Sequence, residues 1–371
     1  MPAARSLNPA EKLDWLRLIR SENIGPITFY QLLARYGSAA AALDALPELA
    51  RRGGRARPLA TCSRDEALRE MAALDRAGAA LVAWGEPHYP QTLAAIEDAP
   101  PLLSARGRLD LAERRAIAVV GARNASANGR RFAREIALQL GQRDLAVVSG
   151  LARGIDAAAH EGALATGTIA VVAGGIDQIY PEENRALHEA IAKRGLILAE
   201  LPVGTPPQAR HFPRRNRIIS GVSLGVVVVE AAIQSGSLIT ARFALEQGRE
   251  VFAVPGSPLD PRCRGANDLI RHGAKLTESA EDVLAELAPH RAPVLREPLP
   301  ILLDPEPLSL GASDWDPARR AVMELLSPTP VEVDELVRAT RLPPAMVAAI
   351  LLEIALAGRL ERQGGNRVAL L

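Results

Sequence analysis

Residues 116–150, AIAVVGARNASANGRRFAREIALQLGQRDLAVVSG, contain two short apolar runs on either side of a longer amphipathic segment. The runs at 117–121 and 145–150 are rich in valine and end at a glycine, and the segment between them has apolar residues at helical spacing. Apolar strands that alternate with helices are typical of a parallel sheet covered on both faces. This stretch therefore predicts a strand–helix–strand unit of an α/β domain.

The same alternation continues over residues 79–288, for which we predict one α/β domain with a doubly wound, mostly parallel sheet. Further apolar runs are expected to be strands at 168–175, 196–200, 224–230 and 250–256.

Residues 1–78 have apolar residues at helical spacing without an alternating strand pattern, so we predict a helical domain of the SAM or helix-hairpin-helix type. Within it, NIGPITFYQLL (23–33) resembles half of a helix-hairpin-helix, whose turn directs backbone amides at a phosphate. Asn23 stands where that turn has its first glycine, and asparagine tolerates a left-handed backbone. Direct DNA contact and a plain packing role both stay open for this turn.

Beyond the α/β domain, residues 289–312 are rich in proline and are expected to form an extended linker. Residues 313–371 contain three helical patterns followed by two short strands around Gly364-Gly365, which predicts a winged-helix domain. Its presumed recognition helix, 343–357, has no Arg, Lys, Asn or Gln, the side chains that read base edges. We therefore expect this domain to serve protein contact or regulation rather than sequence-specific DNA reading.

The composition narrows the classes of protein. The 371 residues carry a formal net charge of +1, so any attraction for nucleic acid must come from local placement of charge. No apolar run is long enough for a signal peptide or a membrane span, and we expect a cytoplasmic protein without membrane contact. Cys62 and Cys263 suggest neither a disulfide framework nor a zinc site, and no HExxH motif exists, so no metal is expected.

Ligands of an open parallel sheet bind at the carboxyl ends of its strands. Here the predicted strands end in glycines and polar residues: Gly121 with Arg123, Ser149-Gly150, Gly174-Gly175, Glu200 and Glu230. Glycine turns and helix N-termini favour anions, so we expect a phosphate-binding crevice. There is no P-loop motif, and Arg123 replaces the second glycine of a dinucleotide-binding turn, so no NAD, FAD or other cofactor is expected. His160 is expected at a helix surface or at the edge of the crevice.

Two further segments are candidates for this crevice. Ser235, Gly236 and Ser237 open a helix after Glu230, where they can cap the helix or bind an anion. HFPRRNRIISG (211–221) predicts a short helix from about Pro213, with Ile218, Ile219 and Val222 on its buried face. Helical phase then makes Arg215 a buried structural anchor, paired with Glu200 or Glu230, and leaves Arg214, Asn216 and Arg217 free for a ligand. On this basis Arg215→Ala is expected to reduce mainly stability and Arg217→Ala mainly affinity.

Five segments occur in an order that resembles the DNA-processing protein A family (DprA, also called Smf): VVGARNASANG, VVSGLARGIDAAAHEGAL, AVVAGGIDQIYPEENRAL, FPRRNRIISG and EAAIQSGSLITARFALEQGREVFAVPG. The resemblance implies a Rossmann-like domain that binds single-stranded DNA, forms a homodimer and helps to load the RecA recombinase during natural transformation, without catalytic residues. Carried onto this sequence, the DNA pocket is lined by Gly121, Arg123, Gly150, Gly174, Gly175, Phe212, Arg214, Asn216 and Arg217. Because aromatic residues make up only 3% of the chain, Phe212 is nearly alone as a base-stacking candidate, and phosphate contacts with little sequence preference are expected.

Two alternatives stay open. The lysine-decarboxylase-like (LOG) nucleotide phosphoribohydrolases share the Rossmann-like architecture and carry a PGGxGTxxE motif with a catalytic glutamate. At the matching place this chain has IQSGSLITAR (233–242) without that acid, which leaves only Glu200 or Glu230 as substitutes. A small-nucleotide sensor is the other alternative.

Overall fold

The computed structural model describes residues 6–55, 57–287, 315–363 and 366–371. The described residues form two compact units: one runs from residue 69 through the α/β region, and the other combines residues 7–68 with the C-terminal residues. The predicted linker at 289–312 lies outside the described residues.

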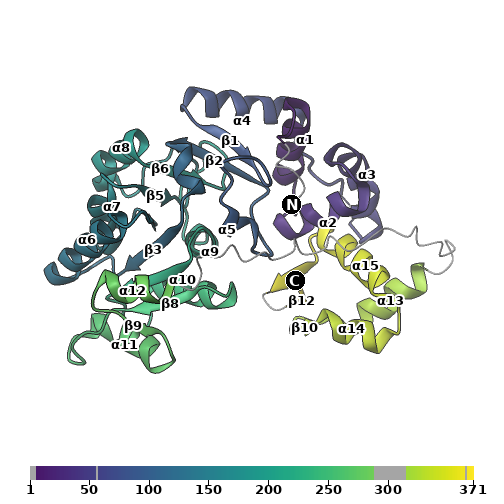
Figure 1. Ribbon diagram of the computed structural model, residues 1–371. Coiled ribbons are helices and arrows are strands. Elements are labelled where there is room, and N and C mark those ends of the chain that lie inside the picture. The colour runs from purple at the N-terminus through teal and green to yellow at the C-terminus, as the bar shows by residue number, and fades with distance from the viewer. Residues whose placement is uncertain (1–5, 56, 288–314, 364–365) are drawn as a thin grey trace. The chain divides into compact units, whose positions relative to one another are not determined.

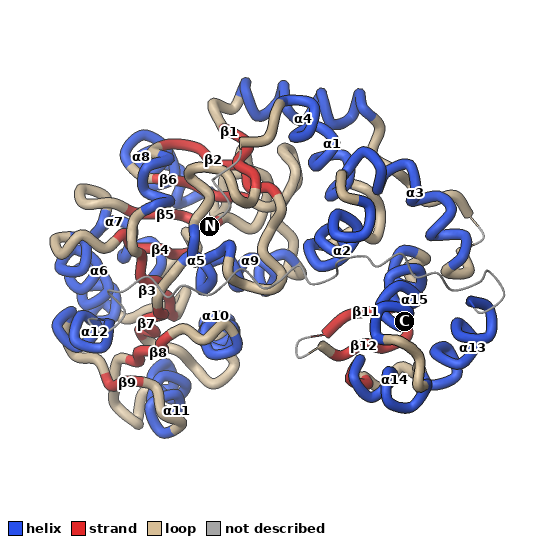
Figure 2. The backbone as a smooth tube through the Cα atoms, turned by 45° about the vertical axis from the view of Figure 1, so that its right-hand side comes forward, coloured by secondary structure: helices blue, strands red, loops and turns tan. Residues whose placement is uncertain are grey.

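A nine-stranded sheet forms the centre of the first unit (Figures 1 and 2), in the order β1-β2-β6-β5-β4-β3-β7-β8-β9. The strands from β6 to β9 in this order pair in parallel, and β1 and β2 form an antiparallel edge. Their bounds are β1 Ala80–Ala83, β2 Leu102–Gly107, β3 Ala116–Gly121, β4 Ala146–Ser149, β5 Thr168–Val171, β6 Leu196–Ala199, β7 Gly225–Val229, β8 Glu250–Ala253 and β9 Lys275–Leu276. The prediction of a doubly wound, mostly parallel sheet is confirmed.

Helices cover both faces of this sheet. On one face Ile218 and Ile219 of α9 (His211–Val222) pack with Ala241 of α10 (Gly236–Glu246) and the short α5 (Gln91–Ala94). The other face is covered by α6 (Ala127–Gly141), α7 (Ile155–Ala163), α12 (Ala280–Leu287) and α8 (Arg185–Arg194). The remaining helices of this unit are α11 (Arg264–Arg271) and three short 3₁₀ turns, Leu109–Glu113, Glu182–Asn184 and Pro261–Cys263. Because buried faces on both sides leave the strands no polar alternation, the strands appear in the sequence as continuous apolar runs.

β1, β2 and β9 were not predicted from the sequence. β9 has only two residues, both exposed, and the first two residues of β1 are not buried, unlike those of β4, β5 and β6. The strand order reverses between β3 and β7, because β4, β5 and β6 lie on one side of β3 and β7 and β8 lie on the other. This reversal places the carboxyl ends of β3, β4, β5 and β7 beside one another, where ligands of such sheets bind.

The second unit contains the N-terminal helices and the winged-helix domain. The N-terminal helices are α1 (Pro9–Arg20), α2 (Pro26–Tyr36) and α3 (Ala39–Arg52), and α4 (Arg64–Arg76) leads into the first unit. The winged-helix domain has α13 (Trp315–Leu325), α14 (Val333–Thr340), α15 (Pro344–Leu356) and a three-stranded sheet of β10 (Val331–Glu332), β12 (Arg367–Leu370) and β11 (Leu360–Gln363). The predicted helical and winged-helix folds are confirmed.

Among the described residues, no single helix is long and apolar enough to span a membrane. The pair α14 and α15 meets the length and apolarity criteria only jointly, across a bend of 120°.

Candidate nucleic-acid interface

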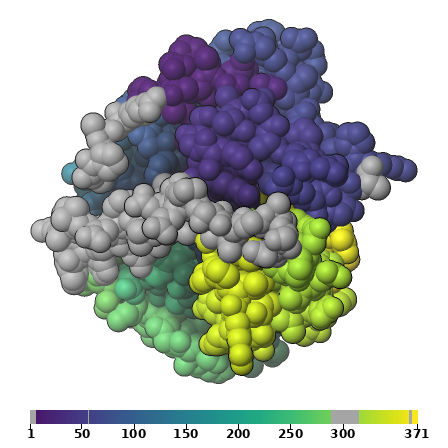
Figure 3. Space-filling view, turned by 90° about the vertical axis from the view of Figure 1, so that its right-hand side faces the viewer, coloured from purple at the N-terminus to yellow at the C-terminus, as the bar shows by residue number. Residues whose placement is uncertain are grey.

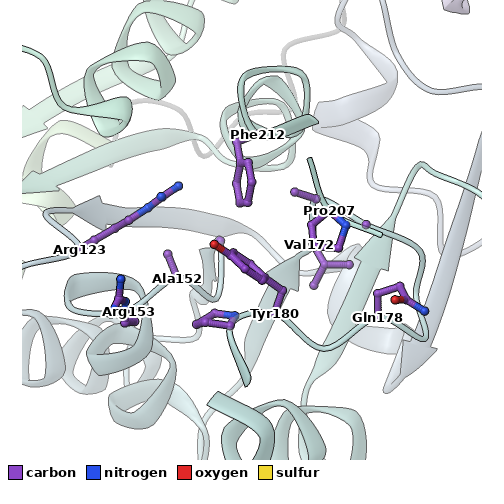
Figure 4. Close-up of a pocket in the computed structure, with 12 residues that line it drawn as sticks. Arg123, Ala152, Arg153, Val172, Gln178, Tyr180, Pro207 and Phe212 are labelled. Carbon is purple, nitrogen blue, oxygen red and sulfur yellow. The ribbon is translucent and has the colours of Figure 1, made fainter. Parts of the chain in front are cut away.

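A pocket of about 520 Å³, including the open space at its mouth, lies at the carboxyl ends of β3, β4 and β5 and at the start of α9 (Figure 4). Four of the predicted contact residues line it: Arg123, Gly150, Gly174 and Phe212. The other lining residues are Ala152, Arg153, Val172, Ala173, Gln178, Tyr180, Pro181 and Pro207. The structure thus brings together residues from four separate sequence motifs.

An aromatic pair and an arginine form one wall of this pocket. The rings of Tyr180 and Phe212 are tilted by 59° with their centroids 5.7 Å apart, and the Arg123 guanidinium lies 5.1 Å from the Phe212 centroid. Tyr180 is 49% exposed, so its ring is accessible to a ligand. The expectation that Phe212 is nearly alone as a stacking residue was therefore wrong. The signal for Tyr180 was its place in the loop that follows the β5 strand.

Arg153 lies at the rim of the pocket, in an exposed ion pair with Glu183 at 3.0 Å. Exposed pairs of this kind contribute about 0–1 kcal/mol, so Arg153 can exchange its partner for a phosphate at little cost. Arg214 is also half-exposed and contacts Glu200 at 3.3 Å.

Arg215 lies beneath the pocket floor. It is 6% exposed, donates through Nη1 to the carbonyl of Val171, and fills the space next to Gly150, where a Cβ would be only 2.1 Å from Nη1. Burial lowers the pKa of Arg215 to about 10, although nearby Asp156 opposes this shift. The prediction that Arg215 is buried is confirmed, but the predicted pairing with Glu200 or Glu230 was wrong.

Asp156 holds the loop that carries Gly150. Its Oδ2 accepts from the backbone amides of Gly150 at 3.1 Å and Ala152 at 3.4 Å. Burial raises the pKa of the Asp156 carboxyl, and Arg215 opposes that shift. The Gly150 amide is thus already bonded within the protein and is not a free donor for a ligand.

His160 is fully buried, so the expectation of a helix surface or crevice edge was wrong. Its Nδ1 lies 2.6 Å from the Thr168 hydroxyl, which itself donates to the carbonyl of Val147. The hydroxyl proton is used in that bond, so Nδ1 carries the proton of the neutral ring. Burial, reinforced by the nearby Arg215 charge, lowers the pKa of His160 to about 3.

The prediction that Asn216 and Arg217 face a ligand was wrong, because both side chains are buried. Arg217 is bound by Glu200 and by the carboxylate and carbonyl of Asp98. Asn216 donates to the carbonyl of Gly236 at 3.2 Å. Helical phase gives α9 a single buried face, but α9 packs against the sheet, α10 and the α5 region at once.

Several other predicted contacts are engaged inside the protein. Ser149 is fully buried and donates to the carbonyl of Val119 at 2.7 Å. Gly121 and Gly175 are closely packed, since a Cβ would meet backbone oxygens at 1.8 Å and 2.5 Å, and neither lines the pocket. Ser235 caps α10 by accepting from the Ser237 amide at 3.4 Å, so this segment matches the capping interpretation. Gly236 is exposed, and none of these three residues lines the pocket.

Glu230 occupies the N-terminus of α6, beside the reversal of strand order. Its carboxylate accepts from the Ser126 amide at 2.8 Å and from the Ser126 hydroxyl, and a Cβ on Gly129 would be 2.5 Å from it. Glu230 also has a left-handed backbone, with φ of 52°. In dinucleotide-binding proteins a phosphate takes this place. The chain's own carboxylate thus fills the anion position next to β3.

Within the described residues, no group of three His, Cys, Asp or Glu side chains is arranged to hold a metal ion.

Known proteins share this architecture and these motifs. Residues 80–288 match the family described as DNA recombination-mediator protein A. Residues 9–73 match the DprA-like N-terminal HHH domain, and residues 303–366 match the DprA winged helix domain.

Individual relatives agree with the domain matches. DNA processing protein DprA of Streptococcus pneumoniae is 48% identical over 200 residues, which cover 53% of this chain and 71% of that protein. The X-ray structure of DNA processing protein A from Streptococcus pneumoniae has a TM-score of 0.61 at 37% identity, and the match covers 76% of this chain and 99% of that one.

A second solved structure concerns the single-stranded DNA binding mode of DNA processing protein A from Helicobacter pylori. Its TM-score is 0.51 at 28% identity, with 54% of this chain and 93% of that chain covered. Together these matches show that the chain belongs to the DNA recombination-mediator protein A family, DprA or Smf.

Proposed function

We propose that this chain binds single-stranded DNA in the pocket at the ends of β3, β4 and β5. The observation that carries the proposal is the aromatic pair of exposed Tyr180 and half-buried Phe212, with Arg123 against the Phe212 ring. Base–aromatic stacking suits unpaired bases, because only an unpaired strand can turn its base faces outward. The Helicobacter pylori relative, whose structure concerns single-stranded DNA binding, supports the same ligand.

The phosphates of the strand are proposed to lie against Arg123 and Arg153, which line the pocket, and against Arg214, two residues after Phe212 in α9; all three are exposed. Gly150 and Gly174 line the same pocket without adding a side chain to it. Stacking and phosphate contacts read no base edge, so binding is proposed to show little sequence preference and to weaken with salt.

The role is proposed to be that of a recombination mediator without catalysis, acting in the cytoplasm, in which the bound strand is passed to the RecA recombinase during natural transformation. Glu230 and Glu200, the two acids considered for an enzyme, support this proposal by their contacts. Glu230 caps α6 through Ser126, and Glu200 is paired with Arg214 and Arg217.

A homodimer through the Rossmann-like domain is proposed as the acting form. Large apolar side chains exposed on this domain support a partner surface: Ile233, Leu245, Leu259 and Leu276 are each more than half exposed. Light scattering of the purified chain tests this, and a monomer at micromolar concentration contradicts it.

The test of DNA binding is a salt titration of fluorescence anisotropy with a labelled single-stranded oligonucleotide and the matching duplex. We expect tighter binding of the single strand and a steep loss of affinity with salt. The mediator role is tested by RecA filament nucleation on the same strand, which the chain is expected to accelerate. Equal affinity for both oligonucleotides contradicts the proposed pocket.

A further inference from the structure

The third helix of the winged-helix domain, α15, has almost no solvent-facing side. From Met346 to Leu356 every residue except Ala348 is buried. A helix that is apolar on all sides is covered on all sides, whereas a helix that reads a DNA groove needs an exposed polar face. More than one part of the protein must therefore pack against α15.

One side of α15 packs inside the winged-helix domain, and another side packs against the N-terminal helical domain. Val347, Ile350 and Ile354 pack into the core with α13 and α14. Leu352 and Leu356 instead belong to the hydrophobic core of the N-terminal helices. That core also contains Leu18, Phe29, Leu32, Leu43, Leu46 and Leu49. Figure 3 shows the yellow C-terminal region next to the purple N-terminal helices.

The contact reaches the backbone at the end of α3. A Cβ on Gly53 would be 1.9 Å from the carbonyl oxygen of Glu353 and 3.0 Å from the Ala357 Cβ. Gly53 has φ of −69°, a value open to any residue, so the reason for glycine here is the close approach of α15. A Cβ on the next residue, Gly54, would be 2.8 Å from Nη1 of Arg359.

The hairpin turn between α1 and α2 faces the same helix. Asn23 has the left-handed backbone expected for this turn, with φ of 60°. Its Nδ2 donates to the carbonyl of Leu356 at 3.1 Å. The last carbonyls of a helix lack partners within the helix, so Asn23 caps the end of α15. The turn that would direct amides at a phosphate is thus packed on the winged-helix domain.

The only charged side chain of α15 is an acid that is held inside the protein. Glu353 is fully buried and accepts from Arg319 at 2.8 Å. A carboxylate at this place repels a DNA phosphate.

We propose that the winged-helix domain is the structural partner of the N-terminal helical domain, and that their contact takes both DNA-reading elements, the hairpin turn and α15, out of DNA binding. The two domains then act as one cooperative unit of the fold. Single-stranded DNA is left to the pocket of the Rossmann-like domain, so this part of the inference rests on the proposed function.

The test compares two glycine variants of the full chain. Gly53→Ala places a methyl group against the α15 backbone, whereas Gly25→Ala, in the hairpin turn, meets nothing within 4 Å. We expect Gly53→Ala to raise hydrogen exchange by about tenfold in α3 and α15 together, because the two helices open as one unit. Gly25→Ala is expected to leave both unchanged. Exchange in α15 that does not follow α3 overturns the proposal.

A second pair of variants, with smaller structural changes, keeps the test valid if Gly53→Ala does not fold. Asn23→Asp removes the donor to Leu356 with almost no change in shape, and Asn366→Asp changes another left-handed asparagine, exposed in the β11–β12 hairpin. Only Asn23→Asp is expected to raise exchange at the end of α15. Equal effects of the two changes overturn the proposal.

The DNA part is tested with the same variants. Single-stranded affinity is expected to stay within about twofold in all of them, since neither element contacts the strand. A loss of about tenfold in Asn23→Asp alone overturns the proposal, because the hairpin turn then binds DNA. The exchange measurement needs no DNA, so failure of the proposed pocket and failure of this contact are distinguishable.

Discussion

Arg217 and Glu200 form an ion pair in which the two side chains are only 5% and 11% exposed. Asp98 contacts the same guanidinium with its carboxylate and its carbonyl. Burial alone would lower the pKa of Arg217, but the nearby carboxylates of Glu200 and Asp98 more than offset this and raise it. The arginines of α9 thus divide differently from the helical-phase prediction: Arg217 and Arg215 are internal, and only Arg214 is exposed.

Arg217→Ala is therefore expected to destabilise the fold rather than to weaken DNA binding. Removing one partner of a buried ion pair leaves the other charge uncompensated, which costs about 3–5 kcal/mol. The free energy of unfolding in urea measures this loss, and anisotropy of the folded variant is expected to give nearly wild-type affinity. Arg214→Ala, which loses only an exposed contact to the same Glu200, is the control and should lose less than about 1 kcal/mol. A stable Arg217→Ala with poor DNA affinity would restore the phase-based interpretation.

Arg123→Ala is expected to weaken single-strand binding and to reduce its salt dependence. Each lost phosphate contact lowers the slope of log K against log salt by about 0.7 for single strands. Arg153→Ala is expected to act in the same direction. Arg134→Ala, an exposed arginine of α6 paired with Glu161 outside the pocket, is the matched control. If Arg134→Ala changes the slope as much as Arg123→Ala does, the loss of any surface arginine has this effect, and the proposed pocket is not the DNA site.

Tyr180→Ala and Phe212→Ala are each expected to weaken single-strand binding by about 1–3 kcal/mol, because each removes a stacking surface. Tyr180→Phe keeps the ring and should bind like the wild type. Fluorescence anisotropy at fixed salt measures the change. Tyr36→Ala, which removes a partly exposed ring in the other unit, serves as the control. Retention of full affinity by the double variant of Tyr180 and Phe212 would exclude stacking in this pocket.

Glu230→Ala is expected to destabilise the fold by about 1–2 kcal/mol, because α6 loses an anionic cap at its N-terminus. Acetate or inorganic phosphate should raise the Tm of this variant more than chloride does at equal ionic strength, since either anion can enter the vacated position. Glu161→Ala, which removes an exposed acid near α6, should show no anion-specific recovery. Identical responses to all three anions would show that the vacated position does not bind anions.

Stability should fall in mild acid because of His160. The pKa of His160 is about 3 in the folded chain and 6.5 when the ring is solvated. Between pH 3 and pH 6.5 the unfolded chain therefore binds a proton at His160 that the folded chain does not bind. The contribution of neutral His160 to the free energy of unfolding is fully present above pH 6.5 and is lost as the pH falls toward 3. From pH 7 to pH 5 the loss from this group is about 2 kcal/mol.

Urea unfolding of His160→Gln at both pH values checks this expectation, since the variant should lose the acid-dependent part. His272→Gln, an exposed histidine beside Asp268, should keep the wild-type dependence. Equal pH dependence in the wild type and in His160→Gln would rule out His160 as the source.

The strands and helices of the α/β domain could be predicted because their signals are local. The apolar composition of a run such as AVVS in β4 or GVVVV in β7 indicates by itself that the strand is buried. The helices between these strands are visible in the spacing of their own apolar residues. The pocket could be predicted in part for the same reason, since strand ends with glycine are visible in the sequence. Arg123, Gly150, Gly174 and Phe212 come together as these signals indicate.

By itself, the sequence determined the fold, the family motifs and the edge of the sheet where a ligand can bind. The tertiary structure decided which polar groups at that edge stay available. Ser149 is bonded to Val119, the Gly150 amide to Asp156, and Arg217 to Glu200 and Asp98, up to 119 residues away in the chain. Helical phase assigns one buried face to α9, but burial depends on every element that packs against it, and two of those elements come from distant segments. Local periodicity holds no information about such partners, because they meet only when the chain is folded.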